Sequence, residues 1–313
     1  MLALHFADAP IPVEVRREPQ VTTVPRWRSA PFRSLPPPAR GPSGRLARMR
    51  IEMASEPGSP RIPNEDYASA ALPAAGRGGA LVVLDGVTPP PRDVGCDHGV
   101  PWYVTRLGGT LLELSGSRRD RTLAQCLAEA IGRTARAHGP GCDLSHARTP
   151  QATVVLVRWD ESAVEYLVLS DSALLLEGPD GSVTPVLDTR LDGLRPAARA
   201  LPPAERAAYL EGLRNAEGGF FTAAADPEAA SRAVTGTVPR ERVRALAALS
   251  DGVTRWAETF RLGDWAGLMA VLRAEGPRSL IARVRAAESA DRAGTAFPRG
   301  KVHDDATAVL VEF

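Results

Sequence analysis

The sequence predicts an α+β fold built as a layered sandwich. Three observations indicate it: short apolar runs that fit buried strands, helical periodicity between groups of these runs, and connections too unequal for regular strand–helix alternation. The predicted helices need sheet faces to cover, so layers are the simplest arrangement. The chain has 313 residues and is 44% hydrophobic, which is enough apolar material for such a core.

The first 44 residues differ in composition from the rest. They are rich in Pro and Arg and show no periodicity, so residues 1–44 are predicted to be a disordered or loosely attached leader. Met49 and Met53 follow closely, and a later translation start is an alternative explanation. The folded domain is expected to span residues 45–313.

The strands are predicted from apolar runs that end at turn residues. The run at 79–86 is rich in Val and Leu and ends on Asp-Gly, and 244–252 repeats this pattern. Asp160-Glu161 is short enough to close a hairpin between two further runs. In order, the predicted strands are residues 45–54, 79–86, 152–159, 164–178, a weaker 182–187, 244–252 and 306–313.

The helices are predicted from apolar residues spaced three and four apart. In the second helix, Leu123, Cys126, Leu127, Ala130 and Ile131 follow this spacing and would form one buried face. In order, the predicted helices are residues 102–115, 121–138, 203–217, 227–234, 263–274 and 276–289.

Composition excludes several classes of protein. Lys plus Arg (38) nearly balance Asp plus Glu (37), so nucleic acid is not an expected partner. No apolar stretch approaches the roughly 20 residues of a membrane span, and no signal peptide is predicted. Three cysteines do not make a disulfide framework, so a reducing cytoplasm is the expected location.

Carboxylates recur next to the predicted strand ends. Glu65-Asp66 follows the first strand, Asp85-Gly86 and Asp251-Gly252 end two others, and Asp304-Asp305 precedes the last. Carboxylates gathered at one sheet edge repel each other unless a cation neutralises them. Carboxylate and carbonyl oxygens suit Mg²⁺ or Mn²⁺, and Gly after Asp lets a backbone carbonyl join the ligands.

The order of these motifs resembles the metal-dependent type 2C Ser/Thr protein phosphatases, as a divergent bacterial-type member. The resemblance covers about residues 45–313. It implies a four-layer α-β-β-α sandwich, with two central antiparallel sheets flanked by helices. The motifs that carry it are Arg61-Ile62-Pro63-Asn64-Glu65-Asp66, LVVLDG, VEYLVLSDSALL, ALAALSDG and HDDATAVLV.

The resemblance also implies a site that holds two Mn²⁺ or Mg²⁺ ions. Asp85 would bridge the ions, with the carbonyl of Gly86 and the side chain of Glu65 near one of them. Asp251 and Asp304 would hold the other ion. Asp66 would support the ligands or reach a metal through water. The implied reaction is attack of metal-activated water on a phosphoprotein monoester, with no protein nucleophile.

Arg61 completes the implied site. It lies four residues before Glu65, where the family places its phosphate-binding arginine. A planar guanidinium there could bind two phosphate oxygens at once.

Several residues depart from the family pattern. No His follows Asp85, and His98 or His303 would have to replace it as a proton donor. Asp171 could bind a third ion, but Arg255 stands where the family often has another Asp. These departures leave two alternatives to a protein phosphatase: a weak or inactive regulatory module, and a hydrolase of small phosphoesters.

Two further groups of residues leave alternatives open. Cys96, His98, Cys142 and His146 could form a zinc site, or the cysteines a disulfide, but spacings of C-x-H and C-x₃-H fit no strong signature. Ordinary loop residues are the expected interpretation. The Phe220-Phe221 pair could belong to a flap over the site or anchor a buried loop.

Overall fold

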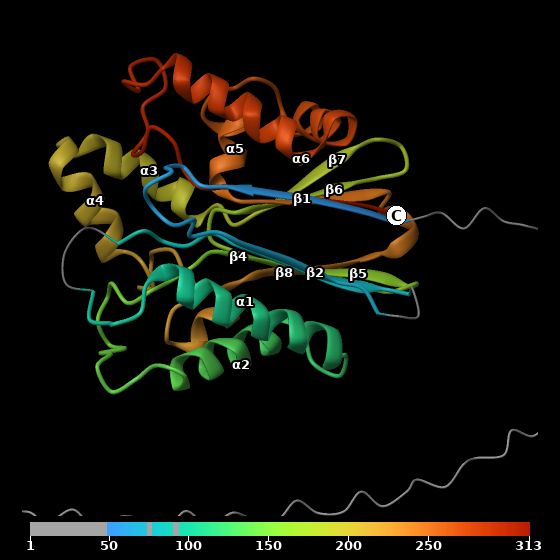
Figure 1. Cartoon of the computed structure of the whole chain (residues 1–313), viewed down its shortest axis with the longest axis horizontal. Helices are drawn as coiled ribbons and strands as arrows, with labels where there is room; N and C mark the ends of the chain where they lie inside the picture. Colours follow the sequence, from blue (N-terminus) through green and yellow to red (C-terminus); the bar gives the residue numbers. More distant parts are fainter. Residues whose placement is uncertain (1–48, 74–76, 90–93) are drawn as a thin grey trace, which may run out of the picture. The chain divides into compact units, whose positions relative to one another are not determined.

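Two antiparallel sheets of five strands each lie face to face at the centre of the fold (Figure 1). The computed structural model describes residues 49–73, 77–89 and 94–313; the predicted leader, residues 1–44, lies outside them. Sheet A has the order β1 (Arg50–Glu56), β10 (Ala306–Glu312), β9 (Ala245–Leu249), β6 (Ala173–Glu177) and β7 (Val183–Leu187). Sheet B has the order β2 (Tyr67–Ala71), β3 (Gly79–Leu84), β4 (Val154–Trp159), β5 (Ala163–Leu169) and β8 (Val234–Pro239).

Helices cover both outer faces of this pair of sheets. In Figure 1, α1 (Val100–Ser117) and α2 (Leu123–Arg136) lie against sheet B, while α5 (Asp251–Glu258) and α6 (Trp265–Ala290) lie against sheet A. The predicted four-layer α-β-β-α sandwich is therefore confirmed. The remaining helices are α3 (Arg190–Ala200), α4 (Pro203–Gly212) and the 3₁₀ turns Pro227–Arg232 and Arg240–Arg242. No helix in the described ranges is long and apolar enough to cross a bilayer.

Strand β3 shows why its sequence reads as a continuous apolar run. Leu81 and Val83 point into the core between the sheets, while Val82 and Leu84 contact the core formed with α1 and α2. Successive side chains of a strand point to opposite faces, and here both faces are covered. The strand therefore buries every residue and fixes the position of Asp85 just beyond its end.

The segment 164–178 corrects one prediction. It was expected to be a single strand, but it forms β5 in sheet B and β6 in sheet A. The break falls at Ser170, whose φ of 68° is a left-handed conformation that no strand continues through. The chain thus changes sheets at Ser170-Asp171-Ser172.

Other differences concern short elements. Residues 227–234 were expected to be helical, but a 3₁₀ turn ends at Arg232 and β8 begins at Val234. Strands β2 and β8 and helices α3 and α5 were not predicted. The two helices predicted at 263–274 and 276–289 form α6, which is kinked where Gly276 adopts a φ of 83°.

Candidate metal centre

Three carboxylates from distant parts of the chain converge at one edge of the sandwich. Asp66 precedes β2, Asp85 follows β3, and Asp251 begins α5 directly after β9. Burial raises the pKa of Asp85 well above its usual range, and repulsion from Asp251 and Asp66 adds to the rise. Burial likewise raises the pKa of Asp66 and that of Asp251 to about 7. Without a cation these groups cannot all be ionised at neutral pH.

Asp85 is held in place by its backbone and by one carboxylate contact. Its N–H donates to Thr153 Oγ1 at 3.2 Å, and its carbonyl accepts from the Thr153 N–H at 2.9 Å. The N–H of Asp251, at the start of α5, donates to Asp85 Oδ2 at 3.2 Å. A helix N-terminus favours negative charge, so this contact orients and stabilises the carboxylate.

Gly86 and Glu65, predicted near one ion, do lie together. A Cβ on Gly86 would stand 2.4 Å from the Glu65 carbonyl oxygen and 2.3 Å from a methyl of Val100, so only Gly fits. The loop that carries Glu65 leads from sheet A to sheet B. Asp305, directly before β10 of sheet A, holds it by accepting hydrogen bonds from the N–H groups of Gly58 and Glu65, each at 2.7 Å. Burial raises the pKa of Glu65, which accepts a short hydrogen bond from the Thr88 hydroxyl.

Asp66 indicates most directly that a cation fits here. Both of its carboxylate oxygens are buried and make no hydrogen bond of normal geometry among the described residues. The hydroxyls of Ser250 and Thr307 lie close enough only to reduce the burial-driven rise in its pKa. A buried, unsatisfied carboxylate beside two others matches the oxygen-rich surroundings of a hard divalent ion.

Lys301 lies among these carboxylates and was not predicted from the sequence. It is the one lysine of an arginine-rich chain. Its ammonium lies 2.7 Å from Asp304 Oδ1 and 2.9 Å from Thr88 Oγ1. Its pKa is raised by Asp304, Asp251 and Asp85 despite a lowering by burial.

Asp304 is paired on both oxygens. Arg255 donates to its Oδ2 at 2.6 Å and to Glu288 at 2.6 Å, while Lys301 occupies Oδ1. Arg255, which stands where the family often has another Asp, therefore contacts a predicted metal ligand. A metal ion at Asp304 would have to displace or share these partners.

A cavity of about 250 Å³ opens onto this cluster. Asp85 and Asp251 keep part of their surface accessible through it. Arg214 also lines the cavity; it stacks over Phe220 at 5.6 Å, and its Nε is buried without a hydrogen-bond partner among the described residues. Burial lowers the pKa of this guanidinium. Phe220 lines the cavity and is only 3% exposed, which fits a buried loop anchor, whereas Phe221 is not among the lining residues.

The remaining predicted residues are less central. Asp171 lines the cavity but pairs with Arg195 at 3.4 Å. Arg61 is exposed and does not line the cavity. Neither His98 nor His303 lines it either, and His303 Nδ1 lies 2.7 Å from Glu288.

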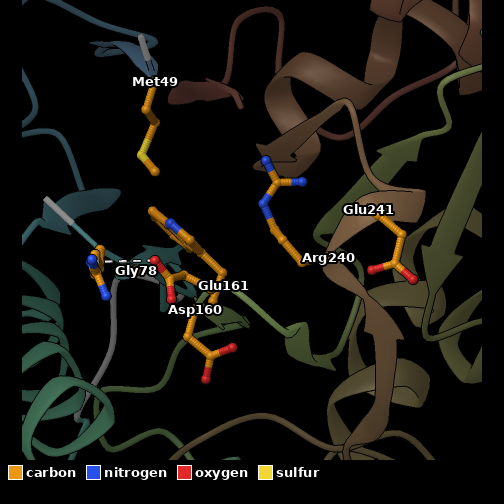
Figure 2. A pocket seen from close by; sticks show the side chains of 8 residues that line it. Met49, Gly78, Asp160, Glu161, Arg240 and Glu241 are labelled. Atoms are coloured by element: carbon orange, nitrogen blue, oxygen red, sulfur yellow. Dashed lines mark ion pairs between the residues drawn. The ribbon is translucent and has the colours of Figure 1, made fainter. Parts of the chain in front are cut away.

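A larger cavity of about 500 Å³ lies elsewhere and is not the candidate site. Figure 2 shows its lining, which includes Met49, Gly78 and Arg240. Gly78 precedes β3 whereas Asp85 follows it, so this cavity is at the other end of the strand. Its charges are mixed, and the dashed pair in Figure 2 joins Arg77 to Glu161 at 3.3 Å. No group of buried carboxylates is among its lining residues.

Comparisons with known proteins support the fold. Among solved structures, the phosphatase Stp1 from Staphylococcus aureus matches 85% of this chain and 95% of its own, with a TM-score of 0.54 at 12% identity. The phosphatase PstP/Ppp from Mycobacterium tuberculosis matches 85% and 98%, with a TM-score of 0.51 at 16% identity. PppA, a regulatory component of type VI secretion in Pseudomonas aeruginosa, matches 84% and 97%, with a TM-score of 0.52 at 18% identity.

One further structure shows metal in a protein of this fold. The catalytic domain of PstP, in complex with two manganese ions, matches 84% of this chain at 17% identity, with a TM-score of 0.51. No family model matches the sequence, and no curated protein matches it. The chain therefore has the fold of the bacterial type 2C Ser/Thr phosphatases.

Proposed function

We propose that this chain, which has the fold of the bacterial Ser/Thr phosphatases, is a divalent-metal-dependent phosphatase of phosphoserine and phosphothreonine in proteins. The observation that carries the proposal is the cluster of Asp66, Asp85 and Asp251, whose burial raises all three pKa values. Such a cluster is costly to the fold unless cations bind there, and perturbed groups in a cavity are typical of functional sites.

The residues proposed to hold Mn²⁺ or Mg²⁺ fall into two groups. Glu65, Asp66 and the Gly86 carbonyl would surround one ion with Asp85, and Asp251 and Asp304 would hold a second ion that shares Asp85. A third ion at Asp171 is not favoured, because Arg195 and Arg255 lie in that region. When bound, the metal would acidify a water molecule and offset charge on the phosphoryl group.

The protein's own groups would orient the substrate and the ligands. The Arg214 guanidinium would donate hydrogen bonds to phosphate oxygens, because Arg214 lines the same cavity as Asp85 and its Nε lacks a partner among the described residues. Arg61, exposed on the loop before Glu65, would approach from outside the cavity. Phe220 forms an apolar wall that limits water near the phosphate.

Catalysis is tested with purified protein, a phosphothreonine peptide and Mn²⁺. Release of phosphate should require the metal and stop with EDTA. Asp85→Asn and Asp251→Asn should each lower the rate about 100-fold or more, since each removes a metal ligand. Asp120→Asn is the matched control, because Asp120 is exposed and pairs with Arg118 away from the cavity. Activity equal to the parent in both site variants would refute the ligand assignment.

A second candidate function is a regulatory module of the same fold with little or no activity. It is favoured by the pairing of both Asp304 oxygens with Lys301 and Arg255. Calorimetric titration with Mn²⁺ separates the two functions, since an enzyme should bind the ion at micromolar to millimolar concentration and the module should not.

The class of substrate is tested separately. Phosphopeptides are compared with sugar phosphates and nucleotides at equal concentration and saturating Mn²⁺. Faster turnover of the peptides supports a phosphoprotein substrate, whereas preference for a small molecule supports a phosphoester hydrolase with the same site.

A further inference from the structure

A group of thiols and an imidazole gathers on two loops beside α1 and α2, outside the carboxylate cavity. Cys96 and His98 lie in the loop before α1, and Cys142 lies in the loop after α2. Cys96 Sγ is 3.1 Å from Cys142 Sγ, and His98 Nδ1 is 3.3 Å from Cys142 Sγ and 3.6 Å from Cys96 Sγ. The three ligand atoms all lie within 4.8 Å of one another, and all three residues are half-buried.

The backbone of the two loops is built to bring these atoms together. The N–H of Asp143 donates to the Gly95 carbonyl at 2.6 Å, which joins the loops directly. Gly95 has a φ of 66°, and a Cβ there would lie 2.5 Å from the Cβ of His146. The N–H of His98 also points at Cys96 Sγ at 3.3 Å, an orientation that stabilises negative charge on sulfur.

His138, just beyond the C-terminal end of α2, lies beside His98 but outside the group of three ligand atoms within 4.8 Å of one another. Its Nδ1 lies 2.9 Å from the carbonyl oxygen of Thr134, so this nitrogen carries the proton and Nε2 carries a lone pair. Nε2 is buried with no hydrogen-bond partner among the described residues. A histidine whose other nitrogen donates to a backbone carbonyl is the usual arrangement of a metal ligand. The ring meets that of His98 edge-on, with centroids 5.2 Å apart.

His146, which the sequence grouped with the cysteines, is oriented differently. Its Nδ1 accepts a hydrogen bond from the N–H of Arg148 at 3.1 Å, so the proton of the neutral ring lies on Nε2. This tautomer presents no free lone pair. His138 is therefore the better fourth ligand.

We propose that Cys96, Cys142 and His98 bind a structural Zn²⁺ ion, and that His138 becomes the fourth ligand when its side chain turns toward the group, since its Nε2 is not among the atoms that lie within 4.8 Å of one another. A tetrahedral zinc ion, with bonds of about 2.3 Å to sulfur and 2.0 Å to nitrogen, spaces its ligand atoms by roughly 3.5–3.8 Å. The contacts of 3.3 and 3.6 Å between His98 Nδ1 and the two sulfurs lie close to this spacing, whereas the sulfurs, 3.1 Å apart, would separate by about 0.7 Å on binding the ion. A disulfide would need the sulfurs about 2.05 Å apart. It would also not explain why the His98 imidazole contacts both sulfurs, as a shared metal ion would. Two thiolates and two imidazoles select zinc over the hard ions that suit the carboxylates.

The position of this site gives it a role independent of the phosphatase chemistry. The first loop, described from Val94 to Gly99, leads into α1, and the second follows α2. A zinc ion would fasten the start of α1 to the end of α2. Its loss should loosen these two loops without removing a ligand from the carboxylates.

The test is the metal content of the full chain, purified from medium supplemented with zinc. Mass spectrometry of the metals should find about one zinc per chain in the parent and almost none in Cys96→Ala or Cys142→Ala. Cys126→Ala is the matched control, since this third cysteine is buried in α2 within the core and should leave zinc content unchanged. Asp85→Asn should also keep its zinc, which separates this site from the carboxylate centre.

Cobalt substitution tests the site in the parent chain itself, so the proposal does not depend on variants that could fail to fold. The parent chain with Co²⁺ should show a thiolate-to-cobalt absorption band and the visible bands of tetrahedral cobalt, and His138→Ala should change the visible bands while keeping the thiolate band. A parent without zinc and without a thiolate–cobalt band would overturn the proposal. An intact mass lower by two hydrogens without reductant would show a disulfide instead and would also overturn it.

Discussion

Arg214 brings a positive charge to the cavity of the carboxylates at some cost to the fold. Its guanidinium is largely buried, burial lowers its pKa, and its Nε has no hydrogen-bond partner among the described residues. Leaving a buried donor unsatisfied costs about 1–3 kcal/mol. A binding role accounts for such a group, because a phosphate oxygen would supply the missing acceptor.

Removal of this guanidinium should therefore weaken substrate binding. For Arg214→Ala we expect kcat/KM on a phosphothreonine peptide to fall about 10–100-fold, the equivalent of one or two charge-assisted hydrogen bonds. Arg214→Lys should recover part of the loss, because it keeps the charge without the planar fork. Steady-state kinetics at saturating Mn²⁺ measure this. Kinetics equal to the parent in Arg214→Ala, with a large loss in Arg61→Ala, would assign the phosphate to Arg61 instead.

Lys301 should compete with a metal ion for Asp304. Its ammonium is 2.7 Å from Asp304 Oδ1, and its side chain is 46% exposed, so both reagents and ions can reach it. Because the chain has no other lysine, reductive methylation modifies it and otherwise only the terminal amine. We expect Mn²⁺ to increase the methylation rate of Lys301, as displacement from Asp304 frees the ammonium.

Peptide mass spectrometry follows this labelling, with Mn²⁺-free and EDTA-treated samples as references. Lys301→Ala should in parallel bind Mn²⁺ about 5–10-fold more tightly at low salt, since one competing charge is removed. Unchanged labelling together with unchanged affinity would mean that the ion does not use Asp304.

The sequence predicted the carboxylates better than the cations around them. Asp85 and Asp251 each adjoin a buried apolar run, so local pattern alone places them at strand ends. The contacts of Lys301 and Arg214 depend on loops whose paths no local pattern determines. The one available signal was that the only lysine lies three residues before Asp304.

At the scale of elements, Asp305 ties the start of β10 to the loop that precedes β2. It accepts the N–H groups of Gly58 and Glu65 at 2.7 Å each. The carboxylate thus holds Glu65 and Asp66 near the other acidic residues without facing the cavity itself.

Asp305→Asn should reduce metal binding although the residue is not a proposed ligand. The amide group would turn a donor toward one of the two N–H groups, so one hydrogen bond is lost. We expect Mn²⁺ affinity to fall about 10–100-fold, as is usual when a partner that orients a metal ligand is changed. Calorimetry measures the affinity, and Asp291→Asn, which removes a similar loop-capping carboxylate outside the cavity lining, is the control. Parent-like affinity in Asp305→Asn would show that the loop is held by other contacts.

The errors in predicting strands have a common cause, which is that contacts distant in sequence decide where these strands begin and end. Residues 164–178 read as one strand because apolar residues continue on both sides of Ser170. The crossover depends on the left-handed Ser170, whose N–H donates to the buried Asp188 at 2.8 Å, a contact 18 residues away in sequence. Strands β2 and β8 are short of large apolar residues and were missed because pairing with β3 and β5, rather than propensity, stabilises them.

At the scale of the whole molecule, the carboxylate cluster links folding stability to pH and metal. In the folded metal-free chain, Asp66 and Asp251 have pKa values of about 7, against about 3.9 when unfolded. Between these values the folded state binds more protons than the unfolded state. The free energy of unfolding therefore decreases as pH rises from about 4 to about 7 because of these groups, and the loss is complete above that range.

Asp85→Asn should consequently stabilise the metal-free protein while it removes activity. Asn keeps the shape of the side chain but takes away the charge that repels Asp66 and Asp251. At pH 8 in EDTA we expect its unfolding temperature to exceed that of the parent by about 2–8 °C, which corresponds to 1–2 kcal/mol in a domain of this size. At pH 5 the difference should shrink, because the parent's carboxylates are then protonated. With Mn²⁺ at pH 8 the order should reverse, since only the parent keeps the full ligand set.

Calorimetry of both proteins measures the difference between their unfolding temperatures, which cancels the pH dependence of the rest of the chain. A parent more stable than Asp85→Asn in EDTA at pH 8 would mean that the acidic cluster does not strain the metal-free fold.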